Sequence, residues 1–339
     1  MDQLEIDAAA GGGQLLRTAL ALSLCTGTAF EMRGIRAQRS RPGLMRQHLT
    51  AVAAAVKIGN ASVEGAAPGA TTIRFAPGKI MPGTYHFSIG TAGSAPLVLQ
   101  TILPALWTAQ QTSEITLEGG THNPLAPSAD FLADTYLPTL ARMGVSARLQ
   151  LERHGFFPAG GGRLVATVEP CAALQPLSAL EAASSVSITA TALISALSEE
   201  IGQRELHEVA RRLQLDASAL TLHRVENAFG PGNALVIRVQ RGDHVETFTG
   251  FGERGISSER VAEHLCREVR DYLAAGAPIG PHLADQLLIP AALAGGGEFI
   301  TTTPTDHLMT NAALIEKFLA VDIEWKKLDE RRWQVSVRA

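Results

Sequence analysis

Residues 85–108 read Tyr-His-Phe-Ser-Ile-Gly-Thr-Ala-Gly-Ser-Ala-Pro-Leu-Val-Leu-Gln-Thr-Ile-Leu-Pro-Ala-Leu-Trp-Thr and place three different patterns in succession. Tyr85–Ile89 alternates apolar and polar side chains, which predicts a strand. Gly90–Ser94 holds only small residues and predicts a turn. Pro96–Thr108 is apolar and long enough for a buried helix, and a first helical turn tolerates proline. The stretch therefore predicts a strand and a helix joined by a small-residue turn.

The flanking residues extend this pattern into repeated β-α-β-α-β-β units. After Thr108 we expect strand Glu114–Glu118, helix Ala129–Arg142 and strands Val145–Leu151 and Arg163–Val168. An earlier series has strand Leu4–Ile6, helix Gln14–Leu24, strand Phe30–Ile35, helix Gly43–Ile58 and strands Ser62–Glu64 and Thr71–Phe75. A third series has helix His282–Leu293, strand Glu298–Thr302, helix Leu308–Leu319 and strands Asp322–Lys326 and Trp333–Val337. The predicted fold class is α+β, with three repeated units sharing one core.

An additional block separates the second and third units. Its expected elements are strand Ser185–Leu193, helix Gly202–Leu213, strands Leu220–Val225, Ala234–Val239 and Val245–Thr249, and helix Ser257–Leu273. We therefore predict a large three-repeat domain at residues 1–179 and 276–339, and a smaller inserted α/β domain at residues 180–275.

The composition is that of a globular protein, with 339 residues, 46% hydrophobic and 18% charged, and a formal net charge of −4. The slight acidity argues against a surface that coats nucleic acid broadly. Three widely spaced cysteines indicate neither a disulfide framework nor a thiolate zinc site. Acidic residues near the N-terminus argue against a signal peptide, and prolines interrupt the uncharged run Ile80–Ser113. We expect a cytoplasmic protein that does not associate with membranes.

A run of cations contrasts with this acidic balance. No acidic residue lies between Glu31 and Glu64, and the stretch holds Arg33, Arg36, Arg39, Arg41, Arg46, His48 and Lys57. Arg36, Arg39 and Arg41 precede Pro42-Gly43, where we expect a helix to begin. Guanidinium groups beside a helix N-terminus suit a phosphate. The alternative interpretation is a solvated basic face.

The motif Gly11-Gly-Gly13-Gln14 also points to an anion. Successive glycines let the backbone approach a ligand closely and present its N–H groups. Arg17 lies one turn further on the same predicted helix. The alternative is a plain tight turn. A second glycine motif, at Gly250–Gly255, matches a dinucleotide fingerprint, but its surroundings look antiparallel, so we favour a flexible turn.

His307 is the best candidate nucleophile. It lies where a helix is expected to begin, and the positive helix end favours the neutral imidazole and stabilises an attached phosphoryl group. The alternative is a histidine that is structural or merely exposed. Asp285-Gln286 lies in an otherwise apolar predicted helix. These two residues either form a solvated face of that helix or belong to a site. Pro127 and Phe131 are candidates for an apolar bed under a purine ring, with ordinary packing as the alternative.

Together these segments resemble the RNA 3′-terminal phosphate cyclases over nearly the whole chain. The resemblance rests on eight segments in the same order: Gly11–Arg17, Ile35–Val52, Gly90–Ser94, Gly119–Pro124, His154–Gly162, Gly230–Asn233, Ala284–Gln286 and His307–Asn311. It implies three repeated units with an inserted domain. It also implies ATP-dependent conversion of an RNA 3′-phosphate to a 2′,3′-cyclic phosphate, through covalent histidine–AMP and an adenylylated RNA end.

The resemblance assigns roles to particular residues. His307 matches the adenylated histidine. The positions that match the nucleotide pocket are Pro127, Phe131, Phe248, His282, Asp285, Gln286 and Asn311. The positions that match the phosphate and RNA site are Gln14, Arg17, Arg36, Arg39 and Gln47. The oligomeric state stays open, a homodimer being one option.

One departure concerns the divalent metal, Mg²⁺ or Mn²⁺, that the resemblance implies. Relatives usually carry Glu directly before the three glycines, whereas this chain has Ala10. Alanine offers no ligand oxygen, so the metal ligands stay unknown, and we expect weaker metal dependence or slower adenylylation with the same fold. Ala10→Glu is expected to raise the rate of histidine–AMP formation, and an unchanged rate would contradict this interpretation.

Two other functions compete with the cyclase. A non-catalytic cyclase-like protein that binds RNA in ribosome assembly would lack the reactive histidine, whereas His307 is present. An enolpyruvyl transferase has a similar repeated architecture, but it would need no covalent histidine–nucleotide.

Overall fold

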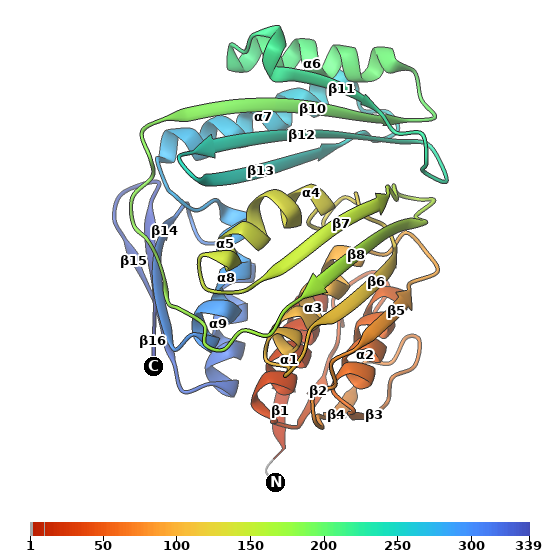
Figure 1. The fold of residues 1–339 in the computed structure, drawn as a ribbon, viewed down its shortest axis with the longest axis vertical. Coiled ribbons are helices and arrows are strands. Elements are labelled where there is room, and N and C mark those ends of the chain that lie inside the picture. Colours follow the sequence, from red (N-terminus) through yellow and green to blue (C-terminus); the bar gives the residue numbers. More distant parts are fainter. Residues whose placement is uncertain (1–2, 10) are drawn as a thin grey trace.

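The computed structural model of the chain describes residues 3–9 and 11–339, apart from the side chains of residues 306 and 307. Three four-stranded sheets repeat one strand order, in which the first two strands are parallel and the last two are antiparallel to their neighbours. The first sheet, β1-β2-β4-β3, contains Leu4–Asp7, Phe30–Arg33, Ile73–Ala76 and Ser62–Glu64. Helices α1 (Gly12–Thr26) and α2 (Arg46–Ile58) belong to this unit (Figure 1).

The second and third sheets follow the same order. The second, β5-β6-β8-β7, contains Thr84–Ser88, Ser113–Gly119, Gly162–Val168 and Ala147–Arg153. The third, β9-β14-β16-β15, contains Leu177–Ala179, Gly296–Thr301, Trp333–Arg338 and Asp322–Lys327. Their helices are α3 (Ala95–Trp107), α4 (Ala129–Phe131) with α5 (Leu137–Ala141), α8 (Pro281–Leu293) and α9 (Asp306–Phe318).

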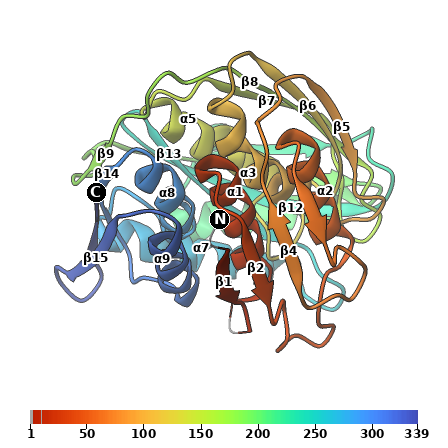
Figure 2. The same ribbon diagram turned by 90° about the horizontal axis from the view of Figure 1, so that it is seen from below.

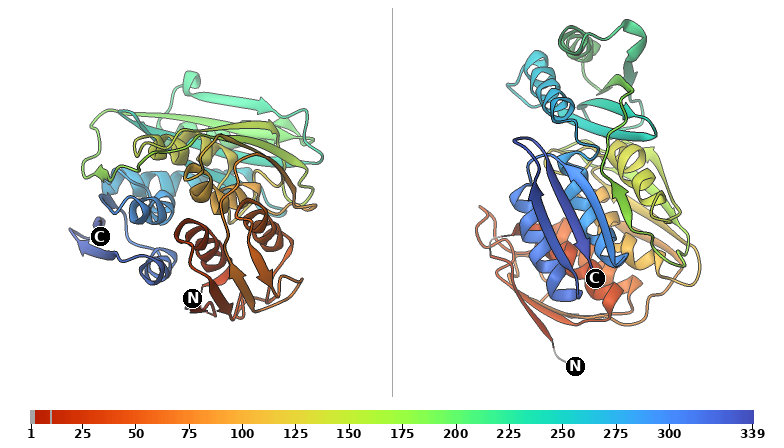
Figure 3. Two further views of the ribbon diagram at one scale, coloured as in Figure 1. Left: turned by 60° about the horizontal axis from the view of Figure 1, so that its bottom comes forward. Right: turned by 90° about the vertical axis from the view of Figure 1, so that its left-hand side faces the viewer.

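The fourth sheet belongs to the segment inserted between β9 and α8. It contains β11 (Leu220–Arg224), β10 (Val186–Ser195), β12 (Gly232–Arg241) and β13 (His244–Phe251), in this order across the sheet. Helices α6 (Glu199–Leu213) and α7 (Ser258–Ala275) cover one face (Figures 1 and 3). The predicted fold class is confirmed: α+β, three repeated units and an inserted α/β unit. The domain boundaries at residues 180 and 275 stay a prediction.

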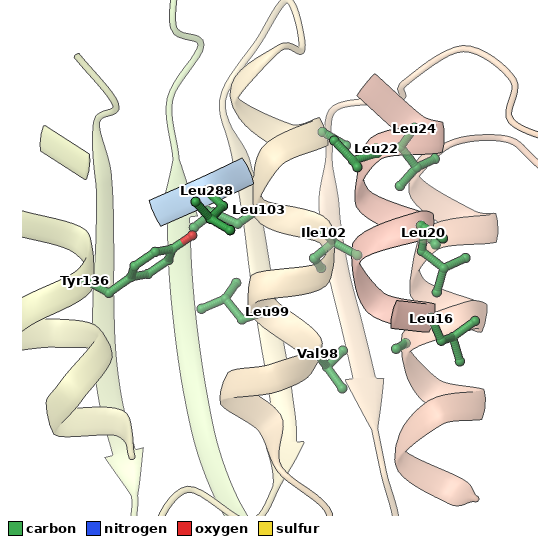
Figure 4. Close-up of a cluster of buried hydrophobic side chains, with 14 of the residues drawn as sticks. Leu16, Leu20, Leu22, Leu24, Val98, Leu99, Ile102, Leu103, Tyr136 and Leu288 are labelled. Atoms are coloured by element: carbon green, nitrogen blue, oxygen red, sulfur yellow. The ribbon is translucent and has the colours of Figure 1, made fainter. Parts of the chain in front are cut away.

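The three units share one core because each turns its helices inward. Figure 2 shows the three sheets on the outside and α1, α3 and α8 between them. Helix α1 packs against both α3 and α9. Leu20 of α1, Ile102 of α3 and Leu288 of α8 are fully buried members of a single cluster (Figure 4). Such burial contributes about 2 kcal/mol per large aliphatic side chain, so the helix ends that carry the site are held firmly.

Three local features differ from the sequence prediction. The first strand of the third unit, β9, was not predicted, because it has only three residues and pairs with β14 across the whole insertion. The helix expected at Ala129–Arg142 contains a π-helical turn at Leu132–Tyr136, since Pro138 cannot donate a backbone hydrogen bond. The helix expected from Gly43 begins at Arg46, because Gly43 adopts φ 76 and its N–H bonds to Ile35 O in a turn.

Polar side chains join the inserted sheet to the second unit. Arg238 of β12 donates to Asp130 Oδ1 at 2.6 Å and to Asp134 Oδ2 at 2.7 Å. Burial opposes ionisation of Asp130, but the hydrogen bond from His122 and the charge of Arg238 hold its pKa below its ordinary range. Ion pairs as well as packing therefore hold the inserted unit against the second unit. No helix within residues 3–9 and 11–339 is long and apolar enough to cross a membrane.

Candidate active site

The glycine motif forms the entry to α1. Gly12 adopts φ 62, in the left-handed region that side chains other than glycine rarely adopt. A Cβ added to Gly13 would lie 2.5 Å from His48 Nε2, so glycine is also needed there for the close approach of α2. Gln14 follows in the first turn with a half-buried side chain. This end of α1 thus places backbone close to side chains of the basic run, and Gly11 and Gly12 are themselves buried.

Arg17 is the most informative side chain at this end. It is half-buried on α1, with Nη1 3.3 Å from the position of a Gly13 Cβ. No acidic side chain in the described part of the chain forms an ion pair with it, and burial lowers its pKa from 12.5 to about 10. A cation kept out of water without a counter-ion is costly unless a ligand supplies the negative charge. Arg17 therefore indicates an anion site.

Arg36 and Arg39 belong to the loop that faces this end of α1. Arg36 Nη1 donates to Arg41 O at 2.7 Å and to Gly43 O at 2.9 Å, which fixes the loop. Burial and then the charge of Arg39 lower the pKa of Arg36. The Arg39 side chain reaches over the glycine motif, with Nη2 3.5 Å from the position of a Gly12 Cβ. The structure thus brings together three guanidinium groups predicted from sequence.

Gln47 links this group of cations to the second unit. Its Oε1 accepts a hydrogen bond from Ser94 N at 2.7 Å, and Ser94 Oγ caps α3 by accepting from Leu97 N. Arg46 lies beside the same turn, with Nη1 3.2 Å from the position of a Gly90 Cβ. The small-residue turn that opened the sequence analysis therefore lies next to the predicted phosphate site.

His48 of α2 also belongs to this end of α1, although nothing in the sequence indicates a role for it beyond the basic run. Its side chain is 8% exposed, and Nδ1 accepts from Met45 N at 3.2 Å, which leaves the proton of the neutral ring on Nε2, facing Gly13. Burial, with the charges of Arg17 and Arg36, lowers its pKa to about 4. Because the imidazole is neutral, it adds no further positive charge beside the two arginines. His48 can be recognised as part of the site only from its packing in the fold.

This depressed pKa predicts how stability depends on pH. The unfolded chain protonates His48 near pH 6.5, whereas the folded chain does so near pH 4, so stability falls as the pH is lowered through this window. Between pH 7 and pH 5 the titration of His48 is expected to lower the free energy of unfolding by about 2 kcal/mol. His48→Gln is expected to remove that part of the slope in urea unfolding series at both pH values. A slope equal to that of the wild type would contradict the assignment.

A second group of predicted residues comes from the third unit. Asn311 of α9 is 2% exposed; its Oδ1 accepts from Thr18 Oγ1 of α1 at 2.6 Å, and its Nδ2 donates to Asp285 O of α8 at 3.4 Å. Asp285 Oδ1 accepts from Thr305 Oγ1 at 2.8 Å, and Thr305 caps α9 by accepting from Leu308 N. These bonds fix the first turns of α9 against α1, next to Arg17.

Two predicted positions fall outside this description. His307 lies in the first turn of α9, but its side chain is outside the described residues, and so is Ala10. For the metal, no group of three His, Cys, Asp or Glu side chains in residues 3–9 and 11–339, residues 306 and 307 aside, could hold an ion. The metal ligands therefore stay unknown.

A cavity of about 580 Å³ opens beside the start of α9, between the third unit and the inserted sheet. Its lining includes Phe248 of β13, Tyr272 of α7, His282 of α8 and the hydroxyls of Thr303 and Thr305. The Phe248 and Tyr272 rings lie 5.5 Å apart. Both rings are almost fully buried in the core of the inserted unit, so they back the cavity from behind its surface. The volume suits a nucleoside. Glu268 and Asp271 line the α7 side, so phosphates would point the other way, toward Thr305.

The remaining predicted pocket residues lie around this cavity rather than in its described lining. Phe131 is buried in the central core, and Pro127 precedes α4. Ser128 Oγ meets Thr249 Oγ1 of β13 at 3.0 Å, which places their segment beside the strand of Phe248. The Gln286 amide accepts from Gln100 Nε2 and donates to His282 O at 3.1 Å, so α3 and the first turn of its own helix hold it. Their binding roles stay predictions.

Comparison with known proteins identifies the family of the chain. Residues 8–325 match the family model described as RNA 3′-terminal phosphate cyclase. Curated proteins of that name include one from Pseudomonas fluorescens, 49% identical with 100% of this chain and 98% of the relative covered. A second, from Ectopseudomonas mendocina, is 47% identical with coverage of 99% and 98%. A third, from Koribacter versatilis, is 49% identical with coverage of 93% and 88%. The chain therefore belongs to the RNA 3′-terminal phosphate cyclase family of enzymes.

Proposed function

We propose that this enzyme uses ATP to convert the 3′-terminal phosphate of RNA into a 2′,3′-cyclic phosphate, with His307 as the covalent nucleotide carrier. The observation that carries the proposal is the cationic end of α1. Arg17, Arg36 and Arg39 gather there without acidic partners in the described part of the chain, beside the glycine motif and the first turn of α9.

The charge balance of this end supports a phosphate substrate. Arg33, in the same basic run, is neutralised by Glu31 at 2.7 Å, whereas Arg17 is buried more deeply and has no such partner among the side chains that the structure describes. Guanidinium groups bind phosphate oxygens in a fork, and the free N–H groups at the start of α1 add donors. A terminal RNA phosphate supplies the missing negative charge.

The cavity supports ATP as the second substrate. The side of the cavity that Phe248 and Tyr272 back would hold the base, and the acids on α7 would direct the triphosphate away from that side, toward the first turn of α9. There the positive end of the helix stabilises negative charge on a phosphoryl group. The α-phosphorus would thus lie next to His307.

The chemistry follows in three steps. A ring nitrogen of His307 attacks the α-phosphorus of ATP, a nitrogen–phosphorus bond forms, and pyrophosphate leaves. An oxygen of the RNA 3′-phosphate, held by Arg17 and Arg39, then displaces the histidine and takes the AMP. Finally the ribose 2′-hydroxyl attacks the 3′-phosphorus, loses its proton and releases AMP, which leaves the cyclic phosphate. The arginines offset the charge that builds up on the phosphorus oxygens.

Incubation with ATP labelled at the α-phosphate tests the first step. The wild type is expected to acquire an acid-labile label, and His307→Ala is expected to acquire none. The control is His86→Ala, at an exposed position of β5, which is expected to label normally. Label on His307→Ala would contradict the assignment of the nucleophile. A folded wild type that acquires no label would contradict the proposal and favour a non-catalytic RNA-binding role.

A further inference from the structure

Three loops present exposed apolar side chains next to the proposed phosphate site. Leu125 is fully exposed, Phe157 is 66% exposed and Phe229 is 67% exposed. They come from the loop after β6, the loop between β7 and β8, and the loop between β11 and β12. Phe157 and Phe229 are the aromatic side chains among the exposed large hydrophobic residues of the described chain. Exposed apolar side chains that lie together mark an interaction site, so these two aromatic rings indicate a ligand that covers them.

Close backbone contacts hold these loops together. A Cβ on Gly161 would lie 2.1 Å from the Phe229 ring, and one on Gly230 would lie 2.7 Å from Ala159 Cβ. The loop after β6 joins them, since Thr121 N donates to Gly155 O at 2.8 Å. The rings are therefore displayed by a rigid surface, formed by residues 121–127, 153–161 and 227–231, which we call the aromatic loop surface.

The aromatic loop surface continues directly into the phosphate site. A Cβ on Gly160 would lie 2.8 Å from Ala92 Cα, in the turn at residues 90–94. The same turn bonds to Gln47 through Ser94 N and lies beside Arg46. A continuous path thus runs from the glycine motif, past Gln47 and Arg46, to Phe157 and Phe229.

The charge along this path suits a polyanion. Residues 90–94, 119–129, 153–162 and 227–233 contain no Asp or Glu. The guanidinium of Arg153 lies 4.2 Å from the centre of the Phe229 ring, and its Nε donates to Gly161 O. Acids border these segments. Glu118 and Glu152 pair with Arg163, the latter at 2.9 Å, and Asp130 pairs with Arg238. Glu226, which precedes the third loop, is exposed. A cation over an exposed ring is the combination that binds an unpaired base together with its phosphate.

We propose that the aromatic loop surface binds the single-stranded RNA that precedes the reacting 3′-terminal nucleotide, with bases stacked on Phe157 and Phe229. This inference rests on the proposed function, because it concerns the same RNA substrate. Stacking tolerates any base, since every base has a flat face. The surface therefore selects single-stranded ends of sufficient length, independent of sequence.

The test compares a decanucleotide and a dinucleotide that both carry a 3′-phosphate. In the double variant Phe157→Leu/Phe229→Leu, which keeps apolar bulk without aromatic faces, KM for the decanucleotide is expected to rise at least about tenfold, or 1.4 kcal/mol. Its kcat, its KM for the dinucleotide and its histidine–AMP formation are expected to match the wild type. A decanucleotide without bases at its internal positions should reproduce the higher KM with the wild type. Leu328→Ala, at an exposed site in the β15–β16 turn, is the control and should change nothing.

The outcomes separate the two proposals. An unchanged KM for the decanucleotide in the double variant, with wild-type conversion intact, would overturn the stacking surface alone. Dissociation of a wild-type dimer by the double variant, with KM unchanged, would show that a second copy of the chain covers these rings and would likewise overturn it. A wild type that forms histidine–AMP but converts neither RNA would overturn the proposed RNA reaction and this inference with it.

Discussion

The Arg17→Met variant is expected to cyclise an RNA 3′-phosphate about 100 times more slowly than the wild type, while its free energy of unfolding stays equal or rises by about 1 kcal/mol. Arg17 is half-buried, has no acidic partner in the described part of the chain, and has a pKa lowered to about 10 by burial. Methionine keeps the apolar stem of the side chain without the charge. Single-turnover rates and urea unfolding measure the two effects.

Opposite signs for activity and stability distinguish a ligand-binding arginine from a structural one. The matched control is Arg33→Met in the same basic run, because Arg33 is exposed and pairs with Glu31. That variant should keep full activity and lose at most about 1 kcal/mol. If Arg17→Met lost stability and kept its activity, Arg17 would be part of the packing and the phosphate site would have to lie elsewhere.

The Asn311→Leu variant is expected to lose about 1–3 kcal/mol of stability and to form histidine–AMP at least about 10 times more slowly. The buried Asn311 amide joins Thr18 of α1 to the Asp285 carbonyl of α8, one helical turn after His307. Leucine leaves the buried Thr18 hydroxyl unpaired and releases the start of α9 from α1. Urea unfolding and the rate of labelling by ATP measure the two effects separately.

A second substitution separates the two causes. Thr18→Val combined with Asn311→Leu removes both members of the pair, so the cost of an unpaired hydroxyl disappears and stability should largely return. Histidine–AMP formation should stay slow, because the bond that positions α9 is still missing. A double variant that regained both stability and rate would show that the pair only stabilises the fold.

The fold was predictable because each unit carries its own local signals. The alternation in Tyr85–Ile89 and the apolar helix at Pro96–Thr108 recur in the other units, and the structure places all three sheets in one strand order. The short strand β9 was not predicted, because its partner β14 lies beyond the insertion and three residues are too few to show a periodicity. The π-helical turn before Pro138 escaped because a helical pattern tolerates one extra residue.

The candidate site was predictable where motifs are local and unpredictable where units meet. Arg17 lies about one turn after Gly13, so their proximity could be inferred from spacing. The Thr18–Asn311 bond joins the first and third units, and no local pattern indicates it. His48 escaped for the same reason: its neutral state arises from burial against Gly13 and two arginines, which only the packing of α2 on α1 creates.

The most direct measurement of the central claim is the fate of an RNA 3′-phosphate incubated with the wild-type protein, with and without ATP. The account predicts an end that resists phosphatase and becomes a 2′,3′-cyclic phosphate, with one AMP released per end, only when ATP is present. An end that stays open to phosphatase in the presence of ATP, with a protein that is folded and binds that RNA, would contradict the account.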